Sequence, residues 1–370
     1  MPVLTANLPV DVFREAMRLV ESGAYATLEQ FMVVAASNQV ALERSTLENV
    51  VPPEGTAATP PSQSKQRKHA LGQRSGAPLK AGGEKRIGLA PEDLHRVLTR
   101  LDLKKCRSIP VDCCPIPEQT GGQRLWGQVN RLFPLKLVCR WIAAYAAEHS
   151  AWPRLAVVLD QIPRDIGVVG SYLEGLDRSC ERSREDAHSA GLPRVGNLAS
   201  CDRFISQFVA RVTRANRAHP GAAFHMAFAC MTGDDIALTA AGLKLALLPN
   251  SVIDGDSHTA DHTLSSEERT LILEHIITTV AAERNDMAVV VRAIHDGHVS
   301  PTGLLSYIRR NFPNEWSELA FRTHVYGILA RLTELGQIAR VRAGRTVTYQ
   351  LNGPAYELLS QTLQDSRRAS

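Results

Sequence analysis

The stretch RTHVYGILARLTELGQIARVRAGRTVTYQLN, from Arg322 to Asn352, decides how the C-terminal part of the chain folds. Its first half has apolar residues at three- and four-residue spacing, which predicts a helix with one apolar face that ends at Gly336. Two short strands are expected next, separated by the turn signal Ala343-Gly344. Basic and polar side chains fall off the apolar face or beside the turn, and these are Arg322, Thr323, His324, Arg331, Arg340, Arg342 and Arg345.

Three further helices are expected before this stretch. The first has Ser265 or Ser266 as its N-cap, the second covers 287–295, and the third starts at Ser300-Pro301 and ends at Arg309-Arg310. This order of helices, turn, strand, wing and strand resembles the winged helix-turn-helix family over residues 267 to 364. The resemblance implies a domain at 257–370 that binds double-stranded DNA with a recognition helix and a basic wing. The residues expected to bind DNA are Arg309, Arg310, Arg322, Thr323, His324, Arg331, Arg340, Arg342 and Arg345.

Residues 1–46 have a different pattern. Alternating apolar residues at 2–8 predict a strand, a helix is expected from Asp11 to Ser22, and Thr27 caps a second helix. The segment is similar to the ribbon-helix-helix family, which implies an intertwined homodimer whose strands pair as a ribbon. The outward strand residues Thr5 and Asn7 would then enter the DNA major groove, but the strand has no basic residue. Residues 1–46, which we call the head, therefore either bind DNA or only form the dimer.

Residues 47–88 are rich in Pro, Gly, Ser and Ala and have almost no large apolar residues, so a disordered linker is expected. The stretch 51–88 contains seven basic and two acidic residues, a net charge of +5, which leaves −1 for the rest of a chain whose total is +4. Such a segment is either a plain solvated linker or a tether that contacts phosphates without sequence preference, with Lys65, Arg67 and Lys68 as the contacts.

Residues 89–256 are expected to form a helical middle domain that ends with a strand, a turn, a strand and a helix. This ending repeats the pattern of the C-terminus and resembles a second, degenerate winged helix whose turn is acidic at Asp234 and Asp235. The middle domain either binds DNA beside the C-terminal winged helix or acts as a scaffold or protein-binding module. The segments expected are a helix to 103, a helical run at 125–148, an apolar piece at 156–162 that Pro163 breaks, a helix at 164–185, an arginine-bearing helix at 203–217, strands at 224–231 and 235–239, and a helix at 241–248.

Two clusters raise the question of a metal. Cys106, Cys113 and Cys114 lie within nine residues, but no fourth ligand is evident and the spacing matches no known zinc finger. Carboxylates and histidines crowd the loop at 254–262, where a hydrophilic hinge is the more plausible reading. No metal and no cofactor is therefore expected.

Composition and missing motifs narrow the class of protein. The seven cysteines are scattered without a CxxC pair, which indicates reduced thiols in a cytoplasmic protein, and no apolar run is long enough to span a membrane. We find no nucleotide-binding, metalloprotease or serine-hydrolase motif, so an enzyme is not expected. The sequence predicts a mainly α protein with short β-ribbons: a ribbon-helix-helix head, a disordered tether and tandem winged-helix-like domains. The expected function is a dimeric, nucleoid-associated DNA-binding protein, a transcriptional regulator of prokaryotic type. The alternatives are a non-catalytic adaptor subunit of a plasmid-maintenance, recombination or phage-defence complex and, more weakly, a DNA-processing subunit.

Overall fold

The structure of the protein is a computed structural model that describes parts of the chain. The chain divides into two compact units, Met1–Lys85 with Thr213–Ala215, and Arg86–Val212 with Asn216–Ser370. The expected strand at 2–8, the linker, Thr5, Asn7, Lys65, Arg67, Lys68 and Arg345 all lie outside the described residues. The described residues are 10–21, 28, 32, 91–115, 124–125, 127–212, 218–255, 257, 260–313, 316–344 and 346–352.

The first unit contributes the helix α1 (Val10–Glu21). This confirms the helix expected from Asp11 to Ser22. Phe13, on its apolar stripe, is 42% exposed.

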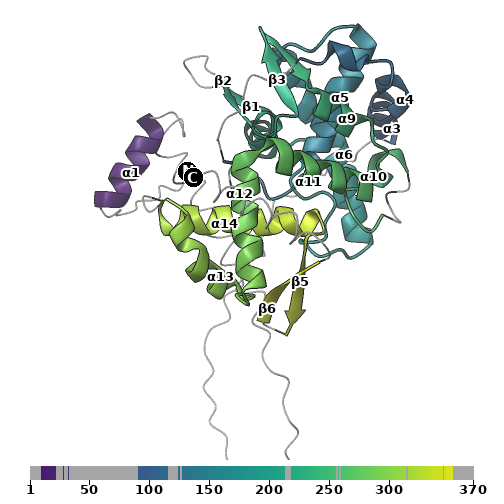
Figure 1. The fold of residues 1–370 in the computed structure, drawn as a ribbon. Helices are drawn as coiled ribbons and strands as arrows, with labels where there is room; N and C mark the ends of the chain where they lie inside the picture. Colours follow the sequence, from purple (N-terminus) through teal and green to yellow (C-terminus); the bar gives the residue numbers. More distant parts are fainter. Residues whose placement is uncertain are drawn as a thin grey trace, which may run out of the picture. The chain divides into compact units, whose positions relative to one another are not determined.

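The second unit is mainly helical, and its described residues include three two-stranded antiparallel sheets that pair neighbouring strands (Figure 1). The boundary expected between the middle domain and the C-terminal domain, at 256/257, lies inside this unit. Among the described residues, every helix falls short of the length or the apolar character that a bilayer span requires. The elements up to residue 254 are α3 (Pro91–Arg100), α4 (Leu103–Cys106), η1 (Val111–Cys113), α5 (Phe133–His149), α6 (Leu155–Ser179), α7 (Leu198–Phe204), η2 (Ile205–Val209), β1 (Ala210–Val212), β2 (Ala218–Pro220), α8 (Ala222–His225), β3 (Ala229–Thr232), β4 (Asp235–Leu238), α9 (Ala240–Leu247) and α10 (Ser251–Asp254).

The C-terminal elements follow in the expected order and are drawn from green to yellow in Figure 1. Ser265 and Glu268 form the capping box of the first of these helices, and Ser300 and Ser317 cap the third and the last. Gly344, at φ +60°, makes the turn between the two strands, as the sequence predicts. The elements are α11 (Ser266–Thr279), α12 (Ala281–His295), α13 (Pro301–Ile308), η3 (Arg309–Asn311), α14 (Glu318–Glu334), β5 (Ile338–Ala343) and β6 (Thr346–Leu351).

The structure of the middle region corrects several expectations. The helix α6 runs through Pro163, because its apolar residues are buried on both sides of the proline and packing outweighs one lost hydrogen bond. The expected arginine-bearing helix at 203–217 ends instead at Val209, and Ala210–Val212 pairs with Ala218–Pro220 as a strand. The strand expected from Phe224 starts only at Ala229, after the short helix α8. The hairpin β3–β4 and the helix α9 after it are confirmed.

Helix α5 lies at the centre of the second unit. Thirteen of its 17 residues are buried, and it contacts α4, α6, α8 and α9. Because α5 is buried on most sides, its apolar residues show no amphipathic pattern, and its sequence is a largely apolar run. The run was expected to be helical from residue 125, but residues 127–132 are not helical and α5 begins at Phe133.

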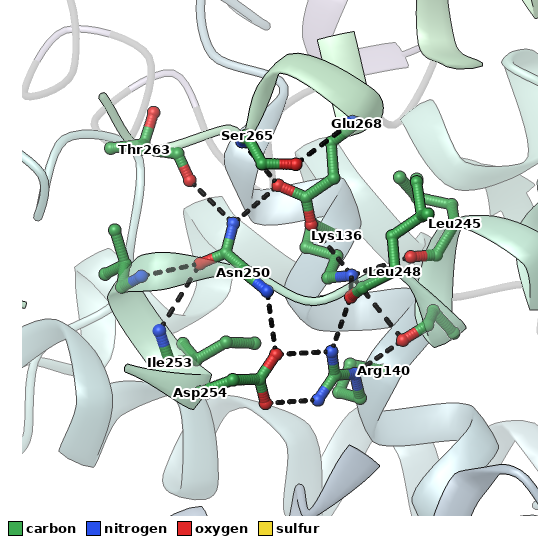
Figure 2. A network of polar contacts seen from close by, with 12 residues as sticks. Lys136, Arg140, Leu245, Leu248, Asn250, Ile253, Asp254, Thr263, Ser265 and Glu268 are labelled. Carbon is green, nitrogen blue, oxygen red and sulfur yellow. Dashed lines mark hydrogen bonds and ion pairs between the residues drawn. The ribbon is translucent and has the colours of Figure 1, made fainter. Parts of the chain in front are cut away.

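Two cations on α5 hold the elements around it together (Figure 2). The buried Lys136 donates to the carbonyl oxygens of Leu245 and Leu248, at 2.7 and 2.5 Å, where α9 ends. Its Nζ also lies 2.8 Å from Oε1 of the buried Glu268 on α11. Arg140 donates to Ala246 O at 2.6 Å and makes a bidentate pair with Asp254 at 2.7 and 2.8 Å. Because buried charges are costly without partners, these contacts tie α5, α9, α10 and α11 into one core.

We expect His188, His225 and His275 to make the protein less stable in mild acid, where the raised pKa of the buried Glu334 acts in the opposite direction. Burial lowers the pKa of His188, His225 and His275 below the usual 6.5, and Arg182 lowers that of His188 further. As the pH falls through about 6.5 the unfolded chain binds protons that the folded chain still excludes, so stability present above this pH is lost below it. Each histidine contributes a slope of at most about 1.4 kcal/mol per pH unit.

Urea unfolding at about pH 7 and about pH 5.5, above the range in which most carboxylates titrate, measures this loss. H275Q keeps a side chain able to donate to Met226 O, which His275 Nε2 contacts at 2.7 Å, and should lose less stability over the same interval. Equal losses in the wild type and in H275Q would contradict the assignment.

Candidate nucleic-acid interface

Helix α14, the expected recognition helix, has three faces. The first packs into the C-terminal core and the second is covered by a segment from the middle of the chain, so both are buried. The third is a stripe that reaches solvent. The core face consists of Phe321, Val325, Ile328, Leu329 and Leu332, the covered face of His324, Gly327 and Arg331, and the stripe of Leu319, Arg322, Thr323, Tyr326, Ala330 and Thr333.

The exposed stripe keeps two of the expected DNA-binding residues. Arg322 is exposed and Thr323 is partly exposed. Two large apolar side chains share the stripe, since Leu319 is 68% exposed and Tyr326 is 39% exposed. The stripe therefore presents one cation, hydroxyl groups and apolar surface, a set of groups that can contact base edges and methyl groups.

The covering segment consists of residues 124–125 and 127–133, and we call it the strap. Gly127 lies so close to α14 that a Cβ atom there would collide with the backbone of Thr323 and His324. A Cβ on Gly327 would likewise collide with the carbonyl oxygen of Gly127. The two glycines thus allow two backbones to touch, which no larger residue would permit at either position.

Arg331 was expected on the outer face of the helix, and this expectation is wrong. Its side chain is fully buried, donates to both carboxylate oxygens of Glu283 on α12 at 2.7 and 3.0 Å, and donates to Val129 O in the strap. The helical period correctly separates Arg331 from the core face, but the strap covers the face on which it lies. Arg331 joins three segments, and because its side chain is fully buried it is not accessible to DNA.

His324 was also expected outside and is also buried. Its Nε2 lies 2.9 Å from Oδ2 of Asp286 on α12. The same carboxylate accepts from Nε of Arg124, at 3.2 and 3.1 Å to its two oxygens. His324 is therefore part of the contact between α12, α14 and the strap.

The C-terminal end of α14 completes this contact. Glu334 accepts the backbone N–H groups of Leu132 and Phe133, at 2.5 and 3.2 Å, and the hydroxyl of Thr263 at 3.1 Å. Helix α5 lacks a capping side chain at its own N-cap, so Glu334 supplies the cap from another helix. Burial raises the pKa of Glu334, against the opposing effects of Arg131 and these N–H groups.

The adjacent arginines Arg309 and Arg310 differ in role. Arg309 donates to the carbonyl oxygens of Pro313 and Trp316 at 2.9 and 3.0 Å and lies over the ring of Phe321, so it fixes the turn before α14. Arg310 is exposed, with its guanidinium carbon 4.7 Å from the centroid of the Tyr307 ring. Of the two, only Arg310 remains a candidate for a phosphate contact.

The hairpin β5–β6 carries the expected wing arginines. Arg340 is exposed but pairs with Glu185 of the middle region. Arg342 is exposed near the turn, and its Nε donates to Gly344 O at 3.3 Å. The hairpin is basic, but its described charge is smaller than the sequence suggests because Glu185 offsets Arg340.

The middle hairpin β3–β4 has an acidic turn at Asp234 and Asp235. Its edge is extended by residues 153–155, since Ile236 N donates to Pro153 O at 2.8 Å and Leu155 N donates to Asp234 O at 2.9 Å. The hairpin is thus joined to the start of α6. These contacts suit a structural role, and the negative charge disfavours phosphate.

Among the possible metal ligands that the structure describes, none come together as a site. Cys106 is buried with its Sγ 3.9 Å from Arg140 O, Cys113 is exposed, and Asp254 is held by Arg140. Within the described part of the chain, no group of three or more His, Cys, Asp or Glu residues is placed to hold a metal ion.

Sequence reasoning missed the residues that decide the shape of this surface, namely Arg124, Glu283, Asp286 and Glu334. One signal was available: Glu283 and Asp286 are three residues apart and so share a face of α12. Carboxylates on one side of a largely apolar helix indicate buried cationic partners. The partners themselves are 38 to 162 positions away in sequence, beyond the reach of local patterns.

Comparison with protein-family models, with curated proteins and with solved structures finds no match to this chain.

Gly327→Ala should destabilise the protein by about 1–3 kcal/mol, because the new methyl group meets the backbone of Gly127. Gly175→Ala is the matched control: Gly175 is exposed in helix α6 and a Cβ there meets nothing within 4 Å. It should stabilise the protein by about 0.5–1 kcal/mol through helix propensity. Urea unfolding gives both values, and the same sign for both variants would contradict the strap contact.

Arg331→Met should cost about 3–5 kcal/mol, since it leaves the carboxylate of Glu283 buried without its cation. The double variant R331M/E283L removes both charges and should regain part of this loss. Arg164→Met, at a side chain that is 69% exposed, should change stability by less than about 0.5 kcal/mol. A loss for R331M as small as that of the control would show that the pair is not buried in solution.

Proposed function

We propose that this chain is a dimeric DNA-binding protein that contacts double-stranded DNA through the exposed stripe of α14 and the β5–β6 hairpin. The observation that carries the proposal is that Arg322 is exposed and Thr323 partly exposed on a helix that is followed directly by a hairpin with exposed Arg340 and Arg342. A helix that projects polar groups beside a basic hairpin suits a major groove and the adjoining phosphates.

The order of elements supports this proposal. Helices α12, α13 and α14 are followed by β5 and β6, which is the winged helix-turn-helix order expected from the sequence. Tyr349 N on β6 donates to Val299 O at 2.9 Å, so the segment between α12 and α13 lies along the edge of the hairpin. The hairpin is thereby fixed to the helices and can act as a wing.

The proposed DNA contacts are fewer than the sequence suggested. Thr323 and Arg322 are assigned to base edges or nearby phosphates, and Arg310, Arg340, Arg342 and Arg345 to phosphates. His324 and Arg331 are assigned to the protein interior, and Arg309 is assigned to the turn before α14. The linker residues Lys65, Arg67 and Lys68 add contacts without sequence preference.

Dimerisation through residues 1–46 completes the proposal. The ribbon-helix-helix resemblance supports it, and Thr5 and Asn7 are its candidates for base contacts. Two C-terminal surfaces in one dimer would recognise two half-sites, as expected of a transcriptional regulator. The basic linker sets how far apart the half-sites lie.

Fluorescence anisotropy with labelled duplex DNA, selected by genome-wide capture on the purified protein, tests the proposal. R322A/R342A should weaken binding roughly 10-fold and reduce the slope of log K against log salt by up to about 2. R96A/R164A removes two arginines whose side chains are 72% and 69% exposed on other helices, and it should bind like the wild type. Equal affinity for the two double variants would overturn the assigned surface, and T323A should change sequence preference.

A second function, as an adaptor that binds another protein, is favoured by the exposure of Leu319 and Tyr326 on the same stripe. Isolation of the protein from a native lysate distinguishes the adaptor from the DNA-binding regulator. A stoichiometric protein partner that L319D loses and R322A/R342A keeps, with no bound DNA, would support the adaptor and not the regulator.

A further inference from the structure

We propose that Asp286, Phe312, Trp316 and His324 form a guanidinium-binding cage whose resident ligand is Arg124 of the same chain. The four cage residues belong to α12, to the turn before α14 and to α14 itself, whereas Arg124 belongs to the strap. The site does not depend on DNA binding. Its occupant holds the outer end of the strap against α14.

The charge of the cage comes from Asp286. This carboxylate is almost fully buried, with a side-chain exposure of 5%, and it faces Arg124 Nε at 3.2 and 3.1 Å from its two oxygens. Its other partner is His324, at 2.9 Å. A buried carboxylate strongly favours a cation beside it, so an emptied cage would retain its attraction for positive charge.

The shape of the cage comes from two aromatic rings. The guanidinium carbon of Arg124 lies 5.8 Å from the centroid of Phe312 and 5.7 Å from that of Trp316, within the distance at which cation–π attraction operates. The imidazole of His324 packs edge-on against both rings, at 5.4 and 5.0 Å, and so holds them in place. A planar, weakly hydrated guanidinium fits rings and a carboxylate better than an ammonium group does.

The cage opens to solvent, which distinguishes it from the other contacts of the strap. The side chain of Arg124 is 39% exposed, whereas that of Arg331, which binds Val129 in the same strap, has no exposed surface. A small guanidinium compound can therefore reach the cage once the Arg124 side chain is removed. Arg124 thus holds the strap in place, and the cage is an arginine-binding site that a residue of the same chain occupies.

Full-length R124A, titrated with ethylguanidinium chloride, tests this assignment. The indole N–H resonance of Trp316 in NMR spectra is the reporter, identified by its loss in W316F. R124A should show a saturable shift at concentrations on the order of 1–10 mM, as suits so small a ligand. Ethylammonium chloride, with the same charge, should bind at least about 5-fold more weakly because it lacks the planar group.

Three controls decide the outcome. The wild type, whose cage is filled, and R124A/D286N, whose cage lacks its carboxylate, should show no saturable shift, and R164A should behave like the wild type. Equal responses of R124A and the wild type, or of R124A and R124A/D286N, would overturn the cage. Should R124A fail to fold in buffer, refolding in ethylguanidinium but not in ethylammonium supports the cage, and failure in both overturns it.

Discussion

The ionic contacts that Lys136 and Arg140 make from the centre of α5 are the constraint on which the rest of the second unit depends. Both cations are buried, and their partners are the carbonyl groups at the end of α9, the carboxylate of Asp254 and that of Glu268. Because a buried cation without its partners is strongly destabilising, these segments have to assemble together. Asn250 reinforces the assembly by donating to Thr263 O at 2.9 Å and to Glu268 Oε2 at 2.6 Å (Figure 2). The residues on the two sides of position 256 therefore share one core, and the change in sequence pattern there does not mark a structural separation.

The same constraint determines what α14 can expose. The strap leads directly into α5, so fixing α5 in the core also brings the strap to α14. Glu334 then caps α5, Arg331 binds Val129, and the two glycines Gly127 and Gly327 bring the backbones into contact. A helix that local pattern describes as amphipathic thus has two buried faces and one exposed stripe. Part of its polar surface stabilises the fold and is not available for recognition.

Local chemistry made much of the C-terminal fold predictable. Capping residues such as Ser265 and Ser300 and the turn glycine Gly344 specify their elements from neighbouring positions alone, and all three are found in the expected role. The burial of His324 and Arg331 was not predictable in the same way. Periodicity shows which face of a helix is apolar, but a polar face is buried only when a distant segment brings complementary groups, as Glu283 and Asp286 do here. Pro163 shows the converse, since packing along α6 outweighs a local helix-breaking signal.

The stripe and the hairpin, in the part of the chain that the structure describes, expose less positive charge than the sequence suggests. Under the proposed function, part of the DNA affinity would therefore have to come from other parts of the chain. Arg322 is the one cation on the described stripe of α14, and Glu185 offsets Arg340 on the hairpin. Electrostatic affinity grows with the number of phosphates neutralised, so a single copy of this surface would bind weakly at physiological salt. Two copies joined in a dimer combine their binding energies, and a basic linker adds contacts that need no fixed geometry. Under the proposed function, sequence recognition by the stripe and the affinity added by dimerisation and the linker would therefore be separate contributions, made by separate parts of the chain.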